Sequence, residues 1–342
     1  MPLLDFEFTH HALHFPQLRL WFDAHRKQGP GQLVVVSHAH SDHTARHAEV
    51  VLSAPTQKLM AARLGGKRQE HVLAFGERVA LTEPRFGVPR DAHLTLWPAG
   101  HILGSAMAKL EAEGRSLLYT GDFKLRAGFS SEICQPVRAD ILVMETTFGR
   151  PRYVFPPAAE VIAGLIQFCR DCLARKEVPV LLGYSLGKAQ ELLVALGGAG
   201  LPLMGHDSMA RMTEIYVEFG RAIPAVRPWD PTAAAECVVL APPGAALEAL
   251  RKHQTIRLAV VTGWALDAGC RYRYRSDAAF PLSDHADYPE LLEFVRQVAP
   301  ERIYTLHGFA GEFATQLRRL GYDARALTEV DQFELALDEP TE

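Results

Sequence analysis

Residues 38–43, which read H-A-H-S-D-H, constrain this chain more than any other segment. They directly follow the apolar run QLVVVS, which is typical of a strand. Because residues two apart in an extended segment project to the same side, His38 and His40 can hold one metal ion. A helix beginning near Thr44 would turn Asp42 and His43 toward a second ion. Four donors at this spacing predict a metal-binding loop and disfavour a chance cluster of histidines on an exposed loop.

Three further donors each follow a strand pattern later in the chain. His101 lies in PAGHILGS, Asp122 in YTGDF and His307 in YTLHG. A two-metal hydrolase needs a carboxylate between ions about 3.5 to 4 Å apart, and Asp122 is the natural candidate. Imidazole and carboxylate donors without thiolate favour catalytic zinc, although manganese can occupy the same donors. The five cysteines are scattered, and we expect them to be reduced thiols.

The apolar patterns divide the chain into two parts. Short strand-like runs dominate the first 150 residues, and helix–strand alternation follows the segment PRYVFPP. The strand pattern resumes at PLSDHADYPELLEFV and RIYTLHG. We therefore predict an α/β protein in which residues 150–282 form a second α/β domain, inserted into a first domain made of residues 1–149 and 283–342.

Charge and hydropathy set weaker limits. The formal net charge of −4 leaves any contact with nucleic acid to local basic patches and bound cations. The N-terminal segment lacks the pattern of a secretory signal, and no segment approaches the roughly 20 apolar residues that span a bilayer. We expect no membrane contact and a cytoplasmic location.

The H-x-H-x-D-H, G-H, G-D and late H-G elements, in this order, resemble the metallo-β-lactamase superfamily. The resemblance covers nearly the whole chain and implies an αββα sandwich. It also implies two metal positions with a carboxylate between them and one aspartate, Asp23 at the end of LRLWFD, that orients ligands without binding metal. The implied ligands are His38, His40 and His101 for one ion, Asp42, His43 and His307 for the other, and Asp122 between them.

Two motifs that flank the insertion look like those of the β-CASP group, whose members cut nucleic acid. These are METTFG with Glu145 and SDHAD with His285, and the group's third motif matches His307. The resemblance implies a β-CASP domain at residues 150–282. Phosphodiester hydrolysis needs a proton for the departing oxygen, and we assign that donor to His285 with Glu145 as its orienting partner. Asp42, Glu145 and His285 are the predicted catalytic residues.

Within the group, the short insertion and the TFG-RPRY segment look most similar to the bacterial ligase-associated DNA exonuclease branch. That resemblance implies a DNA exonuclease in DNA repair, with a DNA ligase or a helicase as partner. RNA-processing members carry histidine at the position of His307, so a ribonuclease of the same group is the alternative.

Basic residues outside the metal loop are candidates for contact with the nucleic-acid backbone. R-Y-R-Y-R at 271–275, if it forms a strand, would present three arginines on one face for phosphates and two tyrosines on the other. An edge strand with buried tyrosines is equally compatible. The predicted substrate contacts are Ser105, Lys124, Arg126, Lys188, Arg271, Arg273 and Arg275.

A competing hypothesis starts from G-Y-S-L-G at 183–187, which matches the nucleophile elbow of serine hydrolases. Ser185 with Asp267 and His307 would then form a triad, but the H-x-H-x-D-H loop would have no role. Two more hypotheses keep the metallo-β-lactamase fold but change the activity. A catalytically silent nucleic-acid-binding member would have lost ligands, and a thiolesterase would need neither Glu145 nor His285.

Overall fold

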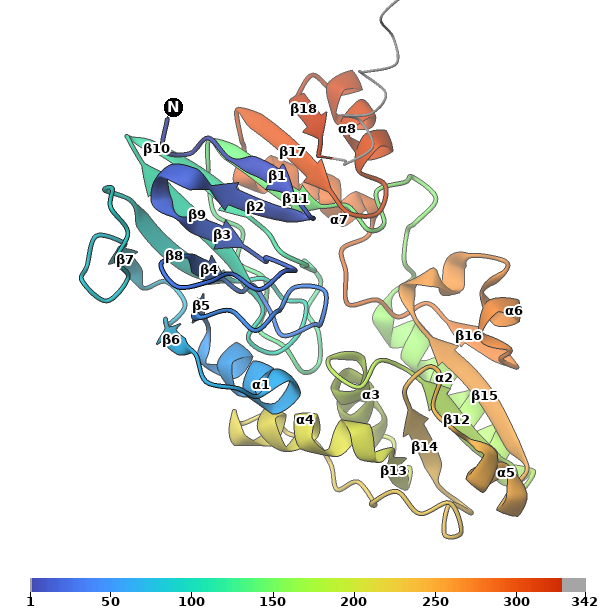
Figure 1. Ribbon diagram of the computed structural model, residues 1–342. Helices are drawn as coiled ribbons and strands as arrows, with labels where there is room; N and C mark the ends of the chain where they lie inside the picture. Colours follow the sequence, from blue (N-terminus) through green and yellow to red (C-terminus); the bar gives the residue numbers. More distant parts are fainter. Residues whose placement is uncertain (1, 328–342) are drawn as a thin grey trace, which may run out of the picture. The chain divides into compact units, whose positions relative to one another are not determined.

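The computed structural model describes residues 2–327, so residues 328–342 of the predicted first domain lie outside the described part. The described chain divides into two compact units. Unit 1 holds the residues up to Ala127, Glu132–Tyr153 and the residues from His285 onward, and unit 2 holds Gly128–Ser131 and Val154–Asp284. Each unit has its own sheets and its own core (Figure 1).

Unit 1 contains two sheets. The first has the order β1-β2-β3-β4-β5-β6, antiparallel from β1 to β3 and parallel from β3 to β6. Its strands are β1 (Glu7–Thr9), β2 (Ala12–Phe15), β3 (Leu20–Phe22), β4 (Leu33–Val35), β5 (Glu49–Leu52) and β6 (Gln69–Val72), with a 3₁₀ turn at Pro16–Leu18 and helix α1 (Ala54–Leu64) after β5.

The second sheet of unit 1 has the order β18-β17-β11-β10-β9-β8-β7. Strands β10, β11, β17 and β18 pair in parallel, and β7 to β10 pair antiparallel. Its elements are β7 (Arg78–Ala80), β8 (His93–Pro98), β9 (Ala106–Ala112), β10 (Arg115–Tyr119), β11 (Ile141–Glu145), α7 (Tyr288–Val298), β17 (Arg302–Leu306), α8 (Ala310–Arg319) and β18 (Asp323–Ala326).

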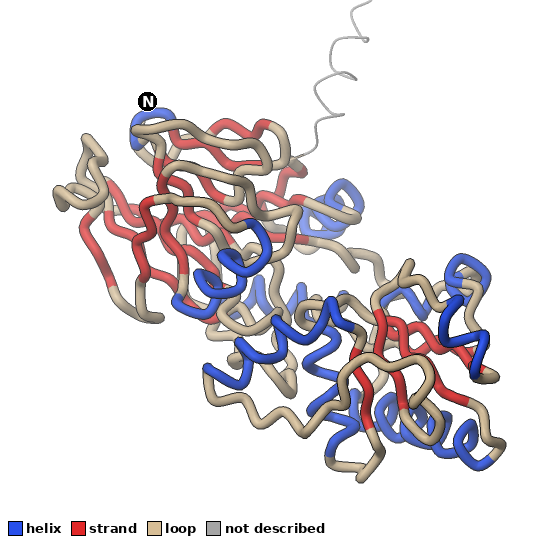
Figure 2. Tube along the Cα trace, turned by 60° about the horizontal axis from the view of Figure 1, so that its bottom comes forward, coloured by secondary structure: helices blue, strands red, loops and turns tan. Residues whose placement is uncertain are grey.

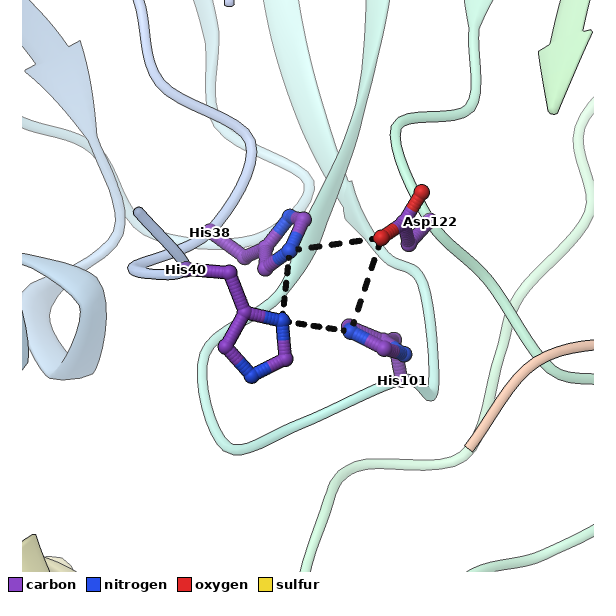
Figure 3. A group of neighbouring side chains, drawn as sticks. All are labelled: His38, His40, His101 and Asp122. Carbon is purple, nitrogen blue, oxygen red and sulfur yellow. Dashed lines mark hydrogen bonds and ion pairs between the residues drawn. The ribbon is translucent and has the colours of Figure 1, made fainter. Parts of the chain in front are cut away.

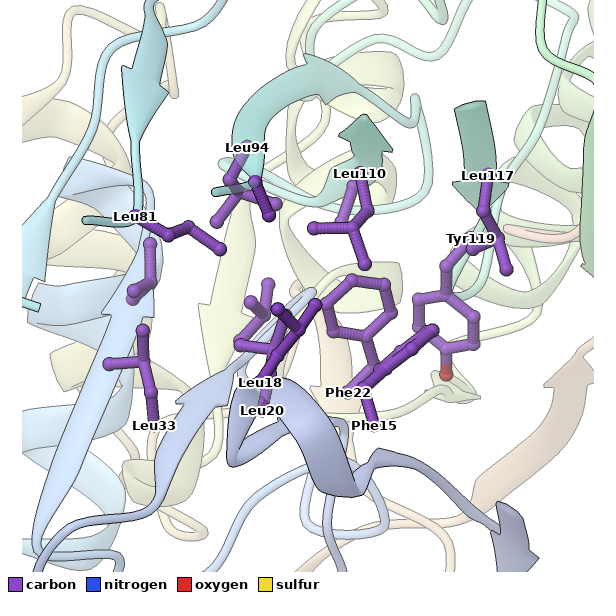
Figure 4. Close-up of a cluster of buried hydrophobic side chains, with 14 of the residues drawn as sticks. Phe15, Leu18, Leu20, Phe22, Leu33, Leu81, Leu94, Leu110, Leu117 and Tyr119 are labelled. Carbon is purple, nitrogen blue, oxygen red and sulfur yellow. The ribbon is translucent and has the colours of Figure 1, made fainter. Parts of the chain in front are cut away.

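The core of unit 1 lies between its two sheets. Phe15, Phe22 and Leu33 of the first sheet pack with Leu94 and Leu110 of the second (Figure 4). A second cluster forms on the other face of the second sheet, where side chains of β10 and β11 meet Phe294 of α7 and Phe313 of α8. Successive side chains of the central strands therefore point to opposite faces of the sheet and contribute to both clusters. The predicted α/β class with a sandwich of sheets and helices is confirmed.

Unit 2 is a parallel sheet of order β13-β14-β12-β15-β16, with helices flanking its strands (Figure 2). Its elements are α2 (Ala158–Ala174), β12 (Val178–Leu182), α3 (Lys188–Gly197), β13 (Leu203–Gly205), α4 (Asp207–Glu218), β14 (Val238–Ala241), α5 (Glu248–His253), β15 (Ile256–Val261), a 3₁₀ turn at Gly263–Leu266, α6 (Cys270–Tyr274) and β16 (Ala278–Phe280). The five cysteines are buried free thiols, as predicted.

Two local predictions are wrong. Residues 271–275 do not form a strand, because Cys270–Tyr274 is the short helix α6 and Arg275 closes it in the left-handed region. No helix begins near Thr44 either. The loop instead turns back on itself, since the amide of His43 and the hydroxyl of Thr44 both donate to the carbonyl of His40, at 3.2 and 3.1 Å. Among the described helices, none is both long and apolar enough to cross a bilayer.

Candidate metal centre

Four predicted ligands converge where strands of unit 1 end. His38 and His40 follow β4, His101 follows β8 and Asp122 follows β10 (Figure 3). The Nδ1 atom of His40 lies 3.1 Å from Nε2 of His38 and 3.0 Å from Nε2 of His101. The Oδ2 atom of Asp122 lies 3.5 Å from Nε2 of His38 and 3.7 Å from Nε2 of His101. One donor atom from each residue lies within 4.8 Å of the other three.

The outer ring nitrogens of His38 and of the neighbouring His43 are held by a second layer of polar groups around Asp23. The carboxylate of Asp23 lies 2.8 Å from Nδ1 of His43 and accepts hydrogen bonds from the hydroxyls of Ser37, at 2.5 Å, and Tyr119, at 2.9 Å. The Ser37 hydroxyl in turn contacts Nδ1 of His38 at 2.9 Å. Metal-binding histidines are usually fixed in this way through the nitrogen that does not bind metal. The Nε2 atoms of His38 and His43 are therefore both directed at Asp122.

Burial and mutual repulsion set the charge state of the cluster. Burial, with His43 and His101 nearby, holds the pKa of His38 well below its usual value. Burial also opposes protonation of His43, but Asp122 and Asp23 outweigh it, so the pKa of His43 is raised. The pKa of Asp122 is lowered, since His43 and His285 outweigh the effect of burial. Neutral imidazole and ionised carboxylate are the forms that bind divalent metal, so His38 and Asp122 are ready to bind a cation, whereas His43 must first lose a proton.

Further candidate donors, for a second cation, lie near Asp122. The Nε2 atom of His43 lies 3.4 Å from Asp122 and 3.9 Å from the carboxylate of Asp42, whose side chain is 70% exposed. The Nε2 atom of His307 is buried without a hydrogen-bond partner in the described chain, and burial lowers its pKa to about 4. The rings of His43 and His307 are 5.8 Å apart. Asp42 and His307 are in none of the groups of described residues whose donor atoms all lie within 4.8 Å of one another.

The turn that presents His307 depends on the glycine after it. His307 and Gly308 both have positive φ angles, 59° and 56°. A Cβ atom on Gly308 would lie 2.4 Å from the Cα atom of Thr147, so no other residue fits there without moving the backbone. This explains the H-G pair that the sequence shows at the end of β17 (Arg302–Leu306).

Sequence reasoning missed two histidines beside the second position. The ring of His25 lies 6.2 Å from that of His43, and its Nε2 atom is buried without a partner among the described residues. The ring of His11 lies 5.7 Å from that of His25 and 6.3 Å from that of His307. The one available signal was the position of His25, two residues after Asp23 at the end of β3.

Glu145 and His285 meet as an ion pair. The Nδ1 atom of His285 lies 2.9 Å from Oε1 of Glu145, which is completely buried at the end of β11. The other carboxylate oxygen of Glu145 accepts a hydrogen bond from the amide of Thr147 at 2.8 Å. The His285 ring is 25% exposed and lies 4.7 Å from the ring of His101. Asp122, Glu145 and His285 each place a donor atom within 4.8 Å of the others, so this pair adjoins the metal cluster.

The structure places three of the predicted substrate contacts of unit 1 in local hydrogen-bond networks or in the interior. The hydroxyl of Ser105 accepts hydrogen bonds from the backbone amides of His101 and Ile102, at 3.1 and 3.2 Å, and so fixes the loop that carries His101. Lys124 is buried. The guanidinium of Arg126 donates to the carbonyl oxygen of His285 at 2.8 Å.

The predicted contacts of unit 2 separate into a buried residue and three exposed ones. Lys188 is buried, and its ammonium group lies 2.6 Å from Asp284 and 3.2 Å from Glu191. The exposed residues are Arg271, Arg273 and Arg275, which lie close to the exposed Tyr272 in the sequence.

The glycine-rich turn 183–187 connects β12 to α3, which is the context that the serine-hydrolase hypothesis requires. The hydroxyl of Ser185 pairs with that of Ser208 at 3.1 Å, and Ser208 contacts Nδ1 of His206 at 3.0 Å. The Nδ1 atom of His206 is also the acceptor that caps α4. This exposed network has no carboxylate member in the contacts described, so it does not reproduce a catalytic triad.

Two known protein families match parts of the chain. Residues 13–157 match the family described as "Metallo-beta-lactamase superfamily", and residues 278–327 match the "Zn-dependent metallo-hydrolase RNA specificity domain".

Named relatives are similar over different shares of the chain. A "Probable DNA ligase" of Opitutus terrae is 51% identical over 335 residues, which are 97% of this chain and 32% of that protein. "Endoribonuclease YSH1" of Gibberella zeae is 27% identical over 48% of the chain and 23% of its own length. The "RNase J-like protein" of Methanocaldococcus jannaschii is 26% identical over 54% of the chain and 50% of its own length. The chain thus spans between about a quarter and a half of these relatives.

Proposed function

Because this chain belongs to the metallo-β-lactamase superfamily, we propose that it is a two-metal nuclease that hydrolyses phosphodiester bonds in DNA. The predicted family, with β-CASP nucleases as relatives, is confirmed by the matches. One observation supports the proposal most strongly. Three imidazole nitrogens and a carboxylate oxygen point at one another from the ends of strands, while Ser37 and Asp23 hold the outer nitrogens of His38 and His43.

The donor group around His40 supports the first proposed ligand set, and the second set keeps the ligands that the sequence implies. His38, His40 and His101 would hold one cation, with Asp122 between the two positions. Asp42, His43 and His307 would complete the second position, with Asp23 fixing His43. Zinc is the proposed metal, because the matched family is described as zinc-dependent, and manganese is the alternative for the same donors. Two divalent cations, when bound, activate water as the nucleophile and neutralise the phosphoryl oxygens.

The remaining steps fall to side chains of the chain itself. Glu145 engages Nδ1 of His285 at 2.9 Å, so the proton to be delivered resides on Nε2. Protonated His285 would donate this proton to the departing oxygen, and buried Glu145 favours the protonated form. The exposed carboxylate of Asp42 can take up the proton that the attacking water loses. This division gives Asp42, Glu145 and His285 their proposed catalytic roles.

The choice of DNA over RNA, and of exonuclease action in DNA repair, is supported by the relative that matches nearly the whole chain. That protein is named a DNA ligase, and this chain aligns with a third of it. We therefore propose a DNA ligase as a functional partner and a helicase as a further one. An RNA-processing role is the second candidate, because residues 278–327 match an RNA specificity domain and further relatives are named endoribonucleases.

Exposed basic residues of unit 2 are the proposed contacts for the nucleic-acid backbone. Arg271, Arg273 and Arg275 are exposed and close in sequence to Tyr272, whose side chain is 91% exposed and can stack on an unpaired base. Unit 2 is accordingly proposed as the inserted β-CASP domain. The buried or hydrogen-bonded side chains of Ser105, Lys124, Arg126 and Lys188 are better placed to hold the protein together than to touch substrate.

The proposal is tested by digestion of end-labelled single-stranded DNA and of RNA of the same sequence, with zinc or manganese added. Wild-type protein is expected to shorten the DNA stepwise, and Asp122→Ala is expected to lower the rate at least about 10³-fold. Ser185→Ala serves as the matched control and should act like wild type. Cleavage of RNA alone would contradict the DNA assignment. Cleavage of neither polymer while a thiolester is hydrolysed would contradict nuclease function.

A further inference from the structure

The short segment from Asp122 to Arg126 connects the metal centre to His285 at several points. Asp122 faces the clustered imidazoles at its beginning. The carbonyl oxygen of Phe123 accepts a hydrogen bond from the amide of Ala286 at 2.7 Å. At the other end, a guanidinium nitrogen of Arg126 donates to the carbonyl oxygen of His285 at 2.8 Å. Two separate main-chain groups on and beside His285 are therefore bound to the segment that carries Asp122.

Arg126 also binds the beginning of α7, which follows His285. Its Nη1 atom forms ion pairs with Asp287 at 3.3 Å and with Glu290 at 3.1 Å, and its backbone amide donates to Glu290 at 2.6 Å. Asp287 and Glu290 cap the first turn of α7 reciprocally. The planar fork of a guanidinium serves a carbonyl and two carboxylates at once, which a lysine ammonium cannot match geometrically. Arg126 is 25% exposed, so these contacts are only partly screened by water.

We propose that Arg126 is a positioning residue for His285. It fixes the main chain of His285 while Glu145 fixes the imidazole, so the proton donor and the carboxylate of Asp122 keep one relative geometry. This inference rests on the proposed nuclease function and on His285 as the proton donor. A displacement of about 1 Å in a reacting group can cost about 100-fold in rate, which is the scale expected for loss of Arg126.

The experiment compares two phosphodiesters that differ in how much their leaving group needs a proton. Single-stranded DNA releases an alkoxide and depends on protonation, whereas bis(p-nitrophenyl) phosphate releases a stable phenolate. For Arg126→Met, we expect the DNA cleavage rate to fall about 10- to 100-fold and the rate on the p-nitrophenyl ester to stay within about 3-fold. Zinc content, measured by mass spectrometry, should equal that of wild type.

Two further variants keep the inference falsifiable. Arg126→Lys keeps a positive charge for Asp287 and Glu290 but loses the fork, so we expect a smaller loss on DNA with the p-nitrophenyl rate again unchanged. Arg115→Met removes an exposed arginine that pairs with Glu301 and should change neither rate, which makes it the matched control.

Three outcomes would overturn the inference. Equal losses on both substrates, or a loss of zinc, would show that Arg126 supports only the fold or the metal centre. Unchanged DNA cleavage in Arg126→Met would show that His285 needs no such support. Wild-type protein that binds zinc but cleaves neither substrate would instead contradict the proposed nuclease function, and the inference with it.

Discussion

Unit 1 and unit 2 each bury a cluster of charged or titratable side chains, but they balance the charge differently. In unit 2, Lys188 lies between Asp284 and Glu191, so the protein supplies its own cation. Burial alone would lower the pKa of Lys188, but the two carboxylates raise it above its usual value. In unit 1, several imidazole nitrogens crowd around Asp122, and no lysine or arginine is among the close partners described.

The difference separates a structural cluster from a binding site. A buried ion cluster is stable when its own members satisfy one another, as they do around Lys188. Around Asp122, imidazole nitrogens meet one another at about 3 Å, so several atoms that can bind a metal converge on one point. An added cation can bind all of them at once. Unit 2 should therefore depend on Lys188 itself, and unit 1 on added metal.

The largest expected effect on stability comes from removing the internal cation of unit 2. Lys188→Met removes the ammonium group that lies between two buried carboxylates, which should lower the free energy of unfolding by about 3 to 5 kcal/mol. Chemical denaturation measures this change. Arg211→Met, which removes an exposed ion pair with Glu214 on α4, is the control and should cost under about 1 kcal/mol. A loss for Lys188→Met no larger than that control would remove the contrast between the units.

Metal should stabilise unit 1 by a somewhat smaller amount. Zinc at about 100 times its dissociation constant is expected to add about 2.7 kcal/mol to the free energy of unfolding, and a chelator should reverse the gain. Thermal melts with and without zinc measure it. Asp122→Ala should abolish the increment, whereas Lys188→Met should keep it, because Lys188 is not one of the proposed ligands. An equal gain from zinc in the Asp122 variant would contradict the assigned centre.

A smaller effect on stability is expected from His47, a buried histidine that belongs to neither cluster. Its Nδ1 atom accepts a hydrogen bond from the backbone amide of Gln28, and burial lowers the pKa of His47 to about 4. The unfolded chain therefore binds the proton more readily, so the contribution of His47 is complete above about pH 6.5 and is lost as the pH falls toward 4. In chelator, wild type should lose about 1 to 2 kcal/mol more than His47→Gln over that interval. Equal losses of unfolding free energy in wild type and His47→Gln across this pH range would refute the prediction.

The smallest expected effect is none at all. Ser185 is half-buried in unit 2, and its hydroxyl contacts that of Ser208 but no histidine among the described residues. Ser185→Ala should therefore leave metal-dependent turnover and stability within experimental error. Steady-state rates on DNA and on a carboxylic ester measure this. Loss of activity in this variant would support the serine-hydrolase hypothesis and would make the metal centre incidental.

The sandwich fold and the candidate donors could be predicted from the sequence because both depend on local pattern. His38 and His40 are two residues apart on one extended segment, and the remaining donors follow strand ends, so their types and order are visible without coordinates. The presence of an αβ-alternating insertion follows from the same periodicity.

Contacts between residues far apart in sequence could not be predicted in this way. Arg126 and His285 are separated by 159 positions, and Lys188 and Asp284 by 96. A basic residue in a loop looks like a phosphate ligand until its carboxylate partners are known. The strand prediction for the R-Y-R-Y-R segment was wrong for a different reason, since alternation over five residues fits a short helix as well as a strand.

The metal content of the purified protein bears most closely on the assignment of unit 1 as a two-metal centre. It is measured by inductively coupled plasma mass spectrometry after zinc loading and removal of excess metal. We expect about two zinc ions per chain in wild type and in Lys188→Met, and fewer than about one in Asp122→Ala. Wild-type protein without bound metal, or an Asp122 variant with the same content as wild type, would contradict the assignment.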